Sequence, residues 1–342
     1  MRPGVTAGPL FAFESRRRRL NLSAMEFIRR AVIDVGTNSV KLLVADVRGQ
    51  EVLPVWEGSK QTRLGKSFYE THRLQTDPIL KTAEAVAHFA ARARDLQALS
   101  VRVIATSAAR DATNAAELTE SILRASGLET AIISGEQEAD WAFAGVTTDS
   151  ELRQRPLLLL DVGGGSTEFI LGHGKEHHMR ESFPLGTVRL LERLPHSDPP
   201  TENQLSSYRH WLRDFLDVQV RPKLELVLAR EKSRLTPSEE IRLVGTGGTA
   251  TVLASMEAEL TTFERERLEA TRLTRDRVQW HVERLWALPL SERKTIIGLP
   301  PNRADVILAG TAIYEAVMER FDFDALRITT RGLRFAAVTQ EL

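Results

Sequence analysis

Two segments of the chain combine an acid, a glycine turn and a hydroxyl residue in the same order. Residues 33–42 are Ile-Asp-Val-Gly-Thr-Asn-Ser-Val-Lys-Leu, and residues 160–169 are Leu-Asp-Val-Gly-Gly-Gly-Ser-Thr-Glu-Phe. In each segment apolar residues precede the acid and resume after the turn, a pattern typical of a β-hairpin. Repetition of this pattern predicts two related domains that each begin with the same hairpin.

The second turn is rich enough in glycine to bind an anion. Gly163, Gly164 and Gly165 leave φ and ψ unrestricted, so successive N–H groups can surround a phosphate together with the Ser166 hydroxyl. The alternative is a plain tight turn, but a two-residue hairpin turn needs fewer glycines. No Gly-Lys-Ser or Gly-Lys-Thr follows, so this is not a Walker-type phosphate loop.

Acidic residues at both turns indicate a magnesium site. Asp34 and Asp161 end their strands at the turn, and Mg²⁺ takes one or two carboxylates together with water and phosphate oxygens. A single aspartate is more simply a cap on its own turn, but the repeat favours a site. Glu168 lies on the returning strand and, by alternation, on the same face as Ser166. The matched residue of the first hairpin is Lys41, so one loop offers acids for a metal and the other a cation for phosphate.

Three further positions are candidates for the chemistry. Glu138 lies in the first turn of an expected helix, where it is either a helix-stabilising acid or a catalytic base. Arg110 follows a strand and suits bidentate phosphate binding, although a solvated helix arginine is the simpler interpretation. Residues 245–250, Gly-Thr-Gly-Gly-Thr-Ala, match the dinucleotide pattern G-x-G-x-x-A, but no clear second strand follows. We therefore expect this third loop to contact phosphate or nucleotide rather than to define a Rossmann domain.

The segments around the hairpins have the pattern of an α/β protein. In the first half we expect strands at 31–35, 40–47, 52–56, 101–106 and 130–134, and helices from Asp77-Pro78, at 108–126 and at 136–145. In the second half we expect strands at 156–161, 167–172, 241–244 and 326–329, and helices at 201–230, from 250, and at 274–285, 303–320 and 332–338. We place the first domain at 31–146, with the C-terminal helix 332–342 as an optional addition, and the second domain at 147–331.

The composition excludes several classes of function. With 46 basic and 46 acidic residues the net charge is zero, so the chain lacks the basic surface of a general nucleic-acid-binding protein. The absence of cysteine excludes disulfides, thiol catalysis and cysteine-based zinc sites, and it makes the cytoplasm the default location. No apolar run has the length of a membrane span.

Residues 1–30 differ in composition from the rest of the chain. Gly, Pro and Ser are scattered around the basic run 16–19, and no long apolar stretch of a secretory signal follows it. We interpret the segment as a disordered tail, or as an upstream start whose true initiator is Met25. An arginine-rich transit segment is the alternative.

Several motifs occur in the order found in the exopolyphosphatase/guanosine pentaphosphate phosphohydrolase (Ppx/GppA) family. The principal ones are 34–39, 105–110, 133–139 and 161–168, and the later ones are 186–190, 245–249, 303–305 and 332–334. The chain resembles this family from about Ala31 to Val338. Each motif alone is unspecific, but their combination in this order is specific.

The resemblance implies two actin-like ATPase (ribonuclease H-like) domains, each with a mixed sheet and an N-terminal β-hairpin phosphate loop, and a cleft between them. Glu138 corresponds to the family's catalytic base, and Asp161 and Glu168 to its magnesium-associated carboxylates. We expect phosphate contacts at Gly36, Thr37, Asn38, Lys41, Arg110, Gly163, Gly164, Gly165 and Ser166. Lys41 is often arginine in the family, so a bidentate contact becomes a point-charge contact. Phe335 stands where the family often has an acid, so the sequence does not support a role for that acid.

Residues and resemblance together predict Mg²⁺-dependent removal of the terminal phosphate from polyphosphate or guanosine pentaphosphate. Glu138 would deprotonate the attacking water while the metal, the loops and Arg110 stabilise the phosphate charge. The alternatives are an actin-like-fold kinase or ATPase, and a non-catalytic sensor of polyphosphate or guanosine pentaphosphate. Family members are often dimers, so a homodimer is expected, whereas nucleic-acid and membrane partners are not.

Overall fold

The structure is a computed structural model that describes residues 26–236 and 239–340. The expected N-terminal tail therefore lies mostly outside the described residues. Its last part is not a tail, because strand β1 (Ile28–Val35) begins at Ile28 rather than at Ala31. Arg29 pairs with Asp46 across the hairpin, and its Nε lies 2.8 Å from that carboxylate. The two arginines before Ala31 concealed this start, because charged residues lower the apolar signal of a strand.

The first sheet has five strands in the order β3-β2-β1-β4-β5. Strands β1, β2 and β3 form an antiparallel meander, and β4 and β5 run parallel to β1. The bounds of the added strands are β2 (Ser39–Arg48), β3 (Glu51–Gln61), β4 (Ser100–Ala105) and β5 (Thr130–Ile132). We call this sheet with its helices α1–α3 the first lobe.

The second sheet repeats this topology and adds one strand. Its order is β10-β11-β9-β6-β7-β8, in which β6, β7 and β8 form the meander and β9 and β11 continue parallel to β6. The bounds are β6 (Leu157–Val162), β7 (Thr167–His173), β8 (Glu176–Phe183), β9 (Arg242–Thr246), β10 (Arg272–Thr274) and β11 (Ala325–Ile328). We call this sheet with helices α5–α13 the second lobe. The expected α/β fold with a duplicated hairpin is confirmed.

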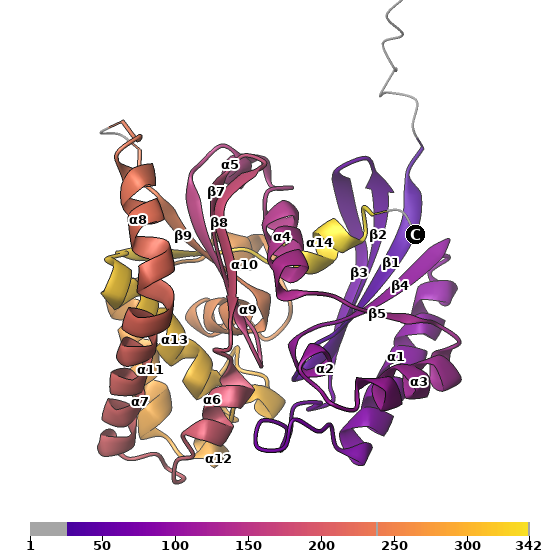
Figure 1. Ribbon diagram of the computed structural model, residues 1–342, viewed down its shortest axis with the longest axis horizontal. Helices are drawn as coiled ribbons and strands as arrows, with labels where there is room; N and C mark the ends of the chain where they lie inside the picture. The colour runs from indigo at the N-terminus through magenta and orange to yellow at the C-terminus, as the bar shows by residue number, and fades with distance from the viewer. Residues whose placement is uncertain (1–25, 237–238, 341–342) are drawn as a thin grey trace, which may run out of the picture.

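The helices cover the sheets and join the lobes (Figure 1). Their bounds are α1 (Thr76–Asp95), α2 (Ser107–Arg110), α3 (Ala115–Ser126), α4 (Gly135–Val146), α5 (Ser150–Arg153), α6 (Thr187–Arg193), α7 (Glu202–Phe215), α8 (Arg221–Lys232), α9 (Gly247–Glu257), α10 (Arg265–Ala270), α11 (Arg275–Ala287), α12 (Leu290–Arg293), α13 (Ile307–Phe321) and α14 (Leu333–Ala337). A π-helical segment (Leu216–Val220) joins α7 to α8, and a 3₁₀ turn (Pro301–Arg303) precedes α13.

Helices α4 and α14 lie between the two lobes (Figure 1). Phe335 of α14 packs with Val32 and Leu43 on the first sheet, and Phe143 of α4 packs with Ile170 on the second. The two helices approach so closely that a Cβ built on Gly145 would lie 2.0 Å from the Gly332 carbonyl oxygen. Only glycine at 145 allows this contact, which packs the end of α4 against the start of α14 where the lobes meet.

Several expected elements differ in detail. The helix expected at 108–126 is broken between α2 and α3, because Asn114 turns its amide to the backbone N–H and carbonyl of Leu74 (2.8 and 3.1 Å). Helix α1 begins at Thr76, so Asp77 is in its first turn rather than at its N-cap. Strands β8 and β10 and helix α6 were not expected. None of the described helices is both long and apolar enough to cross a bilayer.

Candidate active site

The two predicted hairpins have the same register. Asp34 pairs with Lys41 in the first, and Asp161 pairs with Glu168 in the second. Each turn closes on the same backbone hydrogen bond, from Gly36 N–H to the Ser39 carbonyl at 3.1 Å and from Gly163 N–H to the Ser166 carbonyl at 2.9 Å. The repeat is therefore a repeat of structure, and it gives each acid one cross-strand partner.

The second loop is held in place by the start of helix α6. Backbone N–H groups of Thr187 and Val188 donate to the carbonyls of Gly163 and Gly164 at 3.0 and 2.8 Å. Within the described residues, the N–H groups of Gly164 and Gly165 donate to no protein acceptor. A loop with fixed carbonyls and available N–H groups is suited to an anion.

The two loops face each other directly. A Cβ built on Gly164 would lie 3.0 Å from Cβ of Thr37 and 3.4 Å from the backbone nitrogen of Asn38. Between the loops is a small pocket of about 90 Å³. Its walls include all the predicted site residues except Arg110, namely Gly36, Thr37, Asn38, Lys41, Glu138, Asp161, Gly163, Gly164, Gly165, Ser166 and Glu168. Asp34 and the Gly248-Thr249 pair of the third loop also line it.

Glu138 enters the pocket from the first turn of α4. Ser134 caps this helix by accepting a hydrogen bond from the Gln137 N–H at 3.1 Å. Burial raises the pKa of Glu138 to about 7, although Arg110 opposes the rise. A carboxyl group that titrates near neutral pH is suited to act as a general base.

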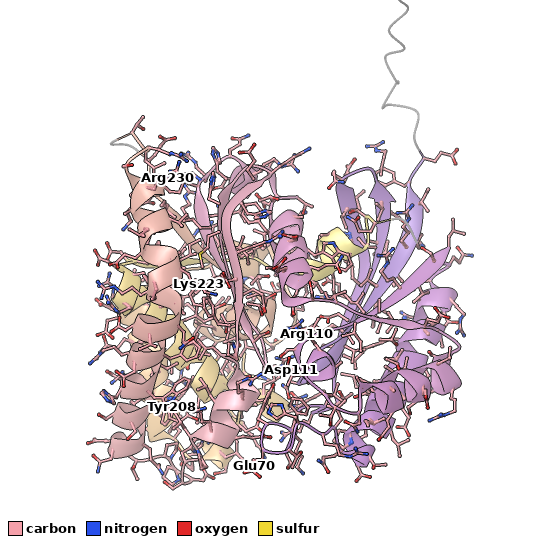
Figure 2. All side chains as sticks on the ribbon, in the orientation of Figure 1. Glu70, Arg110, Asp111, Tyr208, Lys223 and Arg230 are labelled. Carbon is pink, nitrogen blue, oxygen red and sulfur yellow. The ribbon has the colours of Figure 1, made fainter. Side chains whose placement is uncertain are left out.

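Arg110 contacts the proposed base rather than the wall of the pocket. Its Nη1 donates to Oε2 of Glu138 and to the carbonyl of Ile133, both at 3.0 Å. Figure 2 shows Arg110 and Asp111 where the two lobes face each other. The contact fixes the orientation of Glu138, and a direct phosphate contact by Arg110 stays a prediction.

Of the remaining acids Glu168 and Asp34 are buried and Asp161 is half-buried, and the three are close enough to influence the site electrostatically. Burial raises the pKa of Asp161, and Lys41 opposes the rise. Burial also raises the pKa of Glu168 well above its ordinary value, and the negative charges of Glu138 and Asp161 add to the rise. Ser182 donates to Oε1 of Glu168 at 2.7 Å and fixes it. Burial likewise raises the pKa of Asp34.

These carboxyl groups fit Mg²⁺, although they do not form a closed metal cage. No group of three or more Asp, Glu or His side chains in the described part of the chain is arranged as a metal cluster. Mg²⁺ does not need one, because it takes one or two carboxylates and fills its shell with water and phosphate oxygens. Buried acids that raise one another's pKa indicate uncompensated negative charge, which a divalent cation would offset.

Lys41 and Arg334 oppose the raised pKa of both Asp34 and Asp161, and a third cation, Arg303, lines the pocket. Sequence analysis gave a role only to Lys41. Burial lowers the pKa of Lys41, and the nearby Asp34 opposes the effect. Arg303 is half-buried in the pocket wall and donates through Nη2 to the Ser39 hydroxyl at 3.1 Å. Its segment was noted only as a family motif, and its position ahead of α13 gave no signal that it reaches the first loop. Arg303 thus joins the second lobe to the first phosphate loop.

The duplicated lobes and the two facing loops around the cluster of carboxyl groups define a protein of the actin-like ATPase fold. The match to known proteins narrows the class. Residues 43–342 match the Ppx/GppA phosphatase family, and the chain belongs to that family.

Relatives and solved structures agree with this assignment. Exopolyphosphatase 2 of Mycobacterium tuberculosis is 33% identical over 325 residues, which cover 90% of this chain and 97% of that relative. The guanosine-5'-triphosphate,3'-diphosphate pyrophosphatase of Vibrio cholerae is 28% identical over 89% of this chain and 57% of its own length. The Aquifex aeolicus PPX-GPPA enzyme superposes with a TM-score of 0.72 at 30% identity, covering 92% of this chain and 100% of that one.

Proposed function

We propose that this phosphatase hydrolyses the terminal phosphoanhydride bond of inorganic polyphosphate, of guanosine pentaphosphate, or of both, and that it requires Mg²⁺. The observation that carries the proposal is the buried Glu138 carboxyl, whose pKa is about 7, facing two phosphate loops in one small pocket. The names of the mycobacterial and Vibrio relatives support the two substrates. The cytoplasmic location and the homodimer remain predictions.

The chain's own groups supply binding, charge and the proton acceptor. The N–H groups of Gly164 and Gly165 would hold the terminal phosphate, with Lys41 and Arg303 as countercharges. Glu138 would orient a water and accept its proton, while Arg110 keeps the carboxylate in place.

Asp161 and Glu168 are the residues that would hold Mg²⁺, whose positive charge would neutralise phosphate oxygens. They are cross-strand neighbours at the base of the pocket. Burial raises the pKa of Glu168, and the negative charges of Glu138 and Asp161 raise it further, which favours a cation between these acids and the substrate.

The substitution Glu138→Gln tests the proposal, because it keeps the size and removes the base. Phosphate release from polyphosphate and guanosine pentaphosphate should fall by about 10² or more if Glu138 is the general base. Glu136, which is exposed in the same helical turn, offers the matched control Glu136→Gln, and its rate should not change. A Glu138→Gln variant with the rate of the wild type would refute the assignment.

A further inference from the structure

A larger cavity of about 480 Å³ adjoins the candidate active site. Asp34, Lys41, Asp161 and Arg303 line both the small pocket and this cavity, so the two share a wall. The small pocket has room for a terminal phosphate and little more. The rest of a substrate must therefore extend into the larger cavity.

Glu57 is the third acid on the wall of the larger cavity, and the proposed chemistry does not use it. The other two acids, Asp34 and Asp161, belong to the candidate active site. Glu57 lies on β3, and both of its carboxylate oxygens have a cationic partner. Oε1 accepts a hydrogen bond from Arg265 Nη2, and Oε2 lies 3.2 Å from Arg334 Nη2.

The pair of Glu57 and Arg265 connects the cavity wall of the first lobe to a residue of the second lobe. Glu57 belongs to the first lobe, and Arg265 begins α10 of the second. Arg265 also donates through Nη1 to the hydroxyl of Thr330, which lines the cavity on the second lobe. Its guanidinium lies 5.2 Å from the ring centre of Phe335, a further lining residue.

Both arginines are occupied by partners within the protein. Arg265 is shared between Glu57 and Glu269, whose Oε1 lies 3.5 Å from its Nη1. Arg334 donates through Nη1 to the Leu42 carbonyl at 3.0 Å in addition to its contact with Glu57. This end of the cavity is therefore electrically balanced, and a phosphate could use these arginines only by displacing the Glu57 carboxylate.

We propose, on the basis of the proposed function, that Glu57 is a specificity-determining residue that restricts the substrate to a short phosphate chain. A chain that ends inside the cavity meets Lys41 and Arg303 and avoids Glu57. A longer polyphosphate that reaches the β3 side of the cavity meets the Glu57 carboxylate on the wall, where Arg265 and Arg334 are already paired with it. The longer chain therefore gains no free cationic contact at this end and brings its own charge against a carboxylate, so the unfavourable contact penalises only the longer substrate.

The test compares inorganic tripolyphosphate with long-chain polyphosphate, both counted by chain ends, in the full-length protein with Mg²⁺. In wild type, kcat/KM should be at least about tenfold higher for tripolyphosphate than for long-chain polyphosphate, which corresponds to about 1.4 kcal/mol. Glu57→Gln keeps the shape and removes the charge, so it should raise kcat/KM for the long chain and abolish most of the preference. Glu57→Asp keeps the charge and should keep the preference.

Two further variants separate the effect of the Glu57 charge from the effect of the Glu57–Arg265 contact between the lobes. Glu269→Gln removes the other carboxylate that pairs with Arg265, and Glu269 does not line the cavity. This variant should keep the wild-type preference for tripolyphosphate. Arg265→Gln breaks the connection between the lobes but leaves Glu57 charged, so the preference should persist or increase. Faster hydrolysis of the long chain by Arg265→Gln would overturn the proposal even if Glu57→Gln did not fold. Equal kcat/KM for both substrates in wild type would also overturn it.

Failure of the proposed function would look different. Wild type would then release no phosphate from either substrate. Equilibrium binding of the two substrates would then test the role of Glu57. Wild type should still bind tripolyphosphate more tightly than long-chain polyphosphate, and Glu57→Gln should lose this difference. Equal binding of the two by wild type would refute the role of Glu57.

Discussion

The two hairpin loops share a backbone and differ in charge. Both place an aspartate at the end of the first strand and close the turn on a serine carbonyl. The residue opposite the aspartate is Lys41 in the first loop and Glu168 in the second. One cross-strand position thus carries opposite charges in the two lobes.

This difference shows how a duplicated scaffold acquires two functions in one site. Burial lowers the pKa of Lys41 and raises that of Glu168, so the charged form of each group is costly in this site. Residues that are expensive to bury and serve no packing purpose indicate a functional site. In our proposal the first loop neutralises phosphate and the second holds the cation.

The largest expected effect comes from removing the acid of the second loop. Asp161→Asn should lower kcat/KM by about 10³-fold, because it removes a carboxylate that would hold Mg²⁺, and with it the positive charge that stabilises the reacting phosphate. Asp34→Asn is the matched change in the first loop, and its effect should be at least about tenfold smaller if only the second loop holds Mg²⁺. Titration of the rate with Mg²⁺ checks the cause, since Asp161→Asn should need more metal for half-maximal activity.

The cation of the first loop should come next. Lys41→Met should lower kcat/KM by about 10²-fold, as expected for one charge contact in a buried site. Lys60→Met, an exposed change on the neighbouring strand β3, should have no effect. If the two variants behaved alike, Lys41 would not be a phosphate ligand.

The hairpins and most strands were predictable because their signals are local. Alternation of apolar residues and a glycine turn specify a hairpin within about ten residues. Because the same pattern occurs twice, each segment supported the prediction of a hairpin in the other. Asp34, Lys41, Asp161 and Glu168 could be placed in one site because they lie at hairpin ends. The break of the helix expected at 108–126 was not predictable, because it depends on bonds from Asn114 to Leu74.

Arg303 and Glu57 were missed for the same reason. Each reaches the cavities only through the way the two lobes face each other, and neither has a neighbour in sequence that marks its role. Arg303 bonds to Ser39, far away along the chain, and Glu57 bonds to Arg265 of the other lobe. Local patterns predict which backbone will form, but long-range contacts decide which charges meet.

The pH dependence should follow Glu138, which lies between the two loops. Its pKa is raised to about 7, so it is mostly protonated below that pH and cannot accept a proton from water. With the wild type, kcat/KM should rise about tenfold per unit from pH 5 toward 7 and then level off. Glu138→Gln should lose this rise, and persistence of the same profile would assign the titration to another group, such as Glu168.

The smallest effect should distinguish the glycines of the two turns. A Cβ on Gly165 would lie 2.3 Å from Oη of Tyr69 and 2.4 Å from Oγ of Ser107, both in the first lobe. A Cβ on Gly36 would meet only its own hairpin, 3.2 Å from the Ser39 carbonyl oxygen. Gly165→Ala should therefore push the lobes apart and lower kcat/KM by about tenfold, a typical cost of overpacking, while Gly36→Ala loses less.

The measurements that check this difference are kcat/KM and the radius of gyration in solution. Gly165→Ala should increase the radius of gyration slightly, and Gly36→Ala should leave it unchanged. Only the methyl group added at position 165 opposes contact between the lobes. An equal loss of activity in both variants, without a change in radius, would mean that the second loop acts within its own lobe. The facing of the two loops would then be a consequence of the fold rather than a requirement of the chemistry.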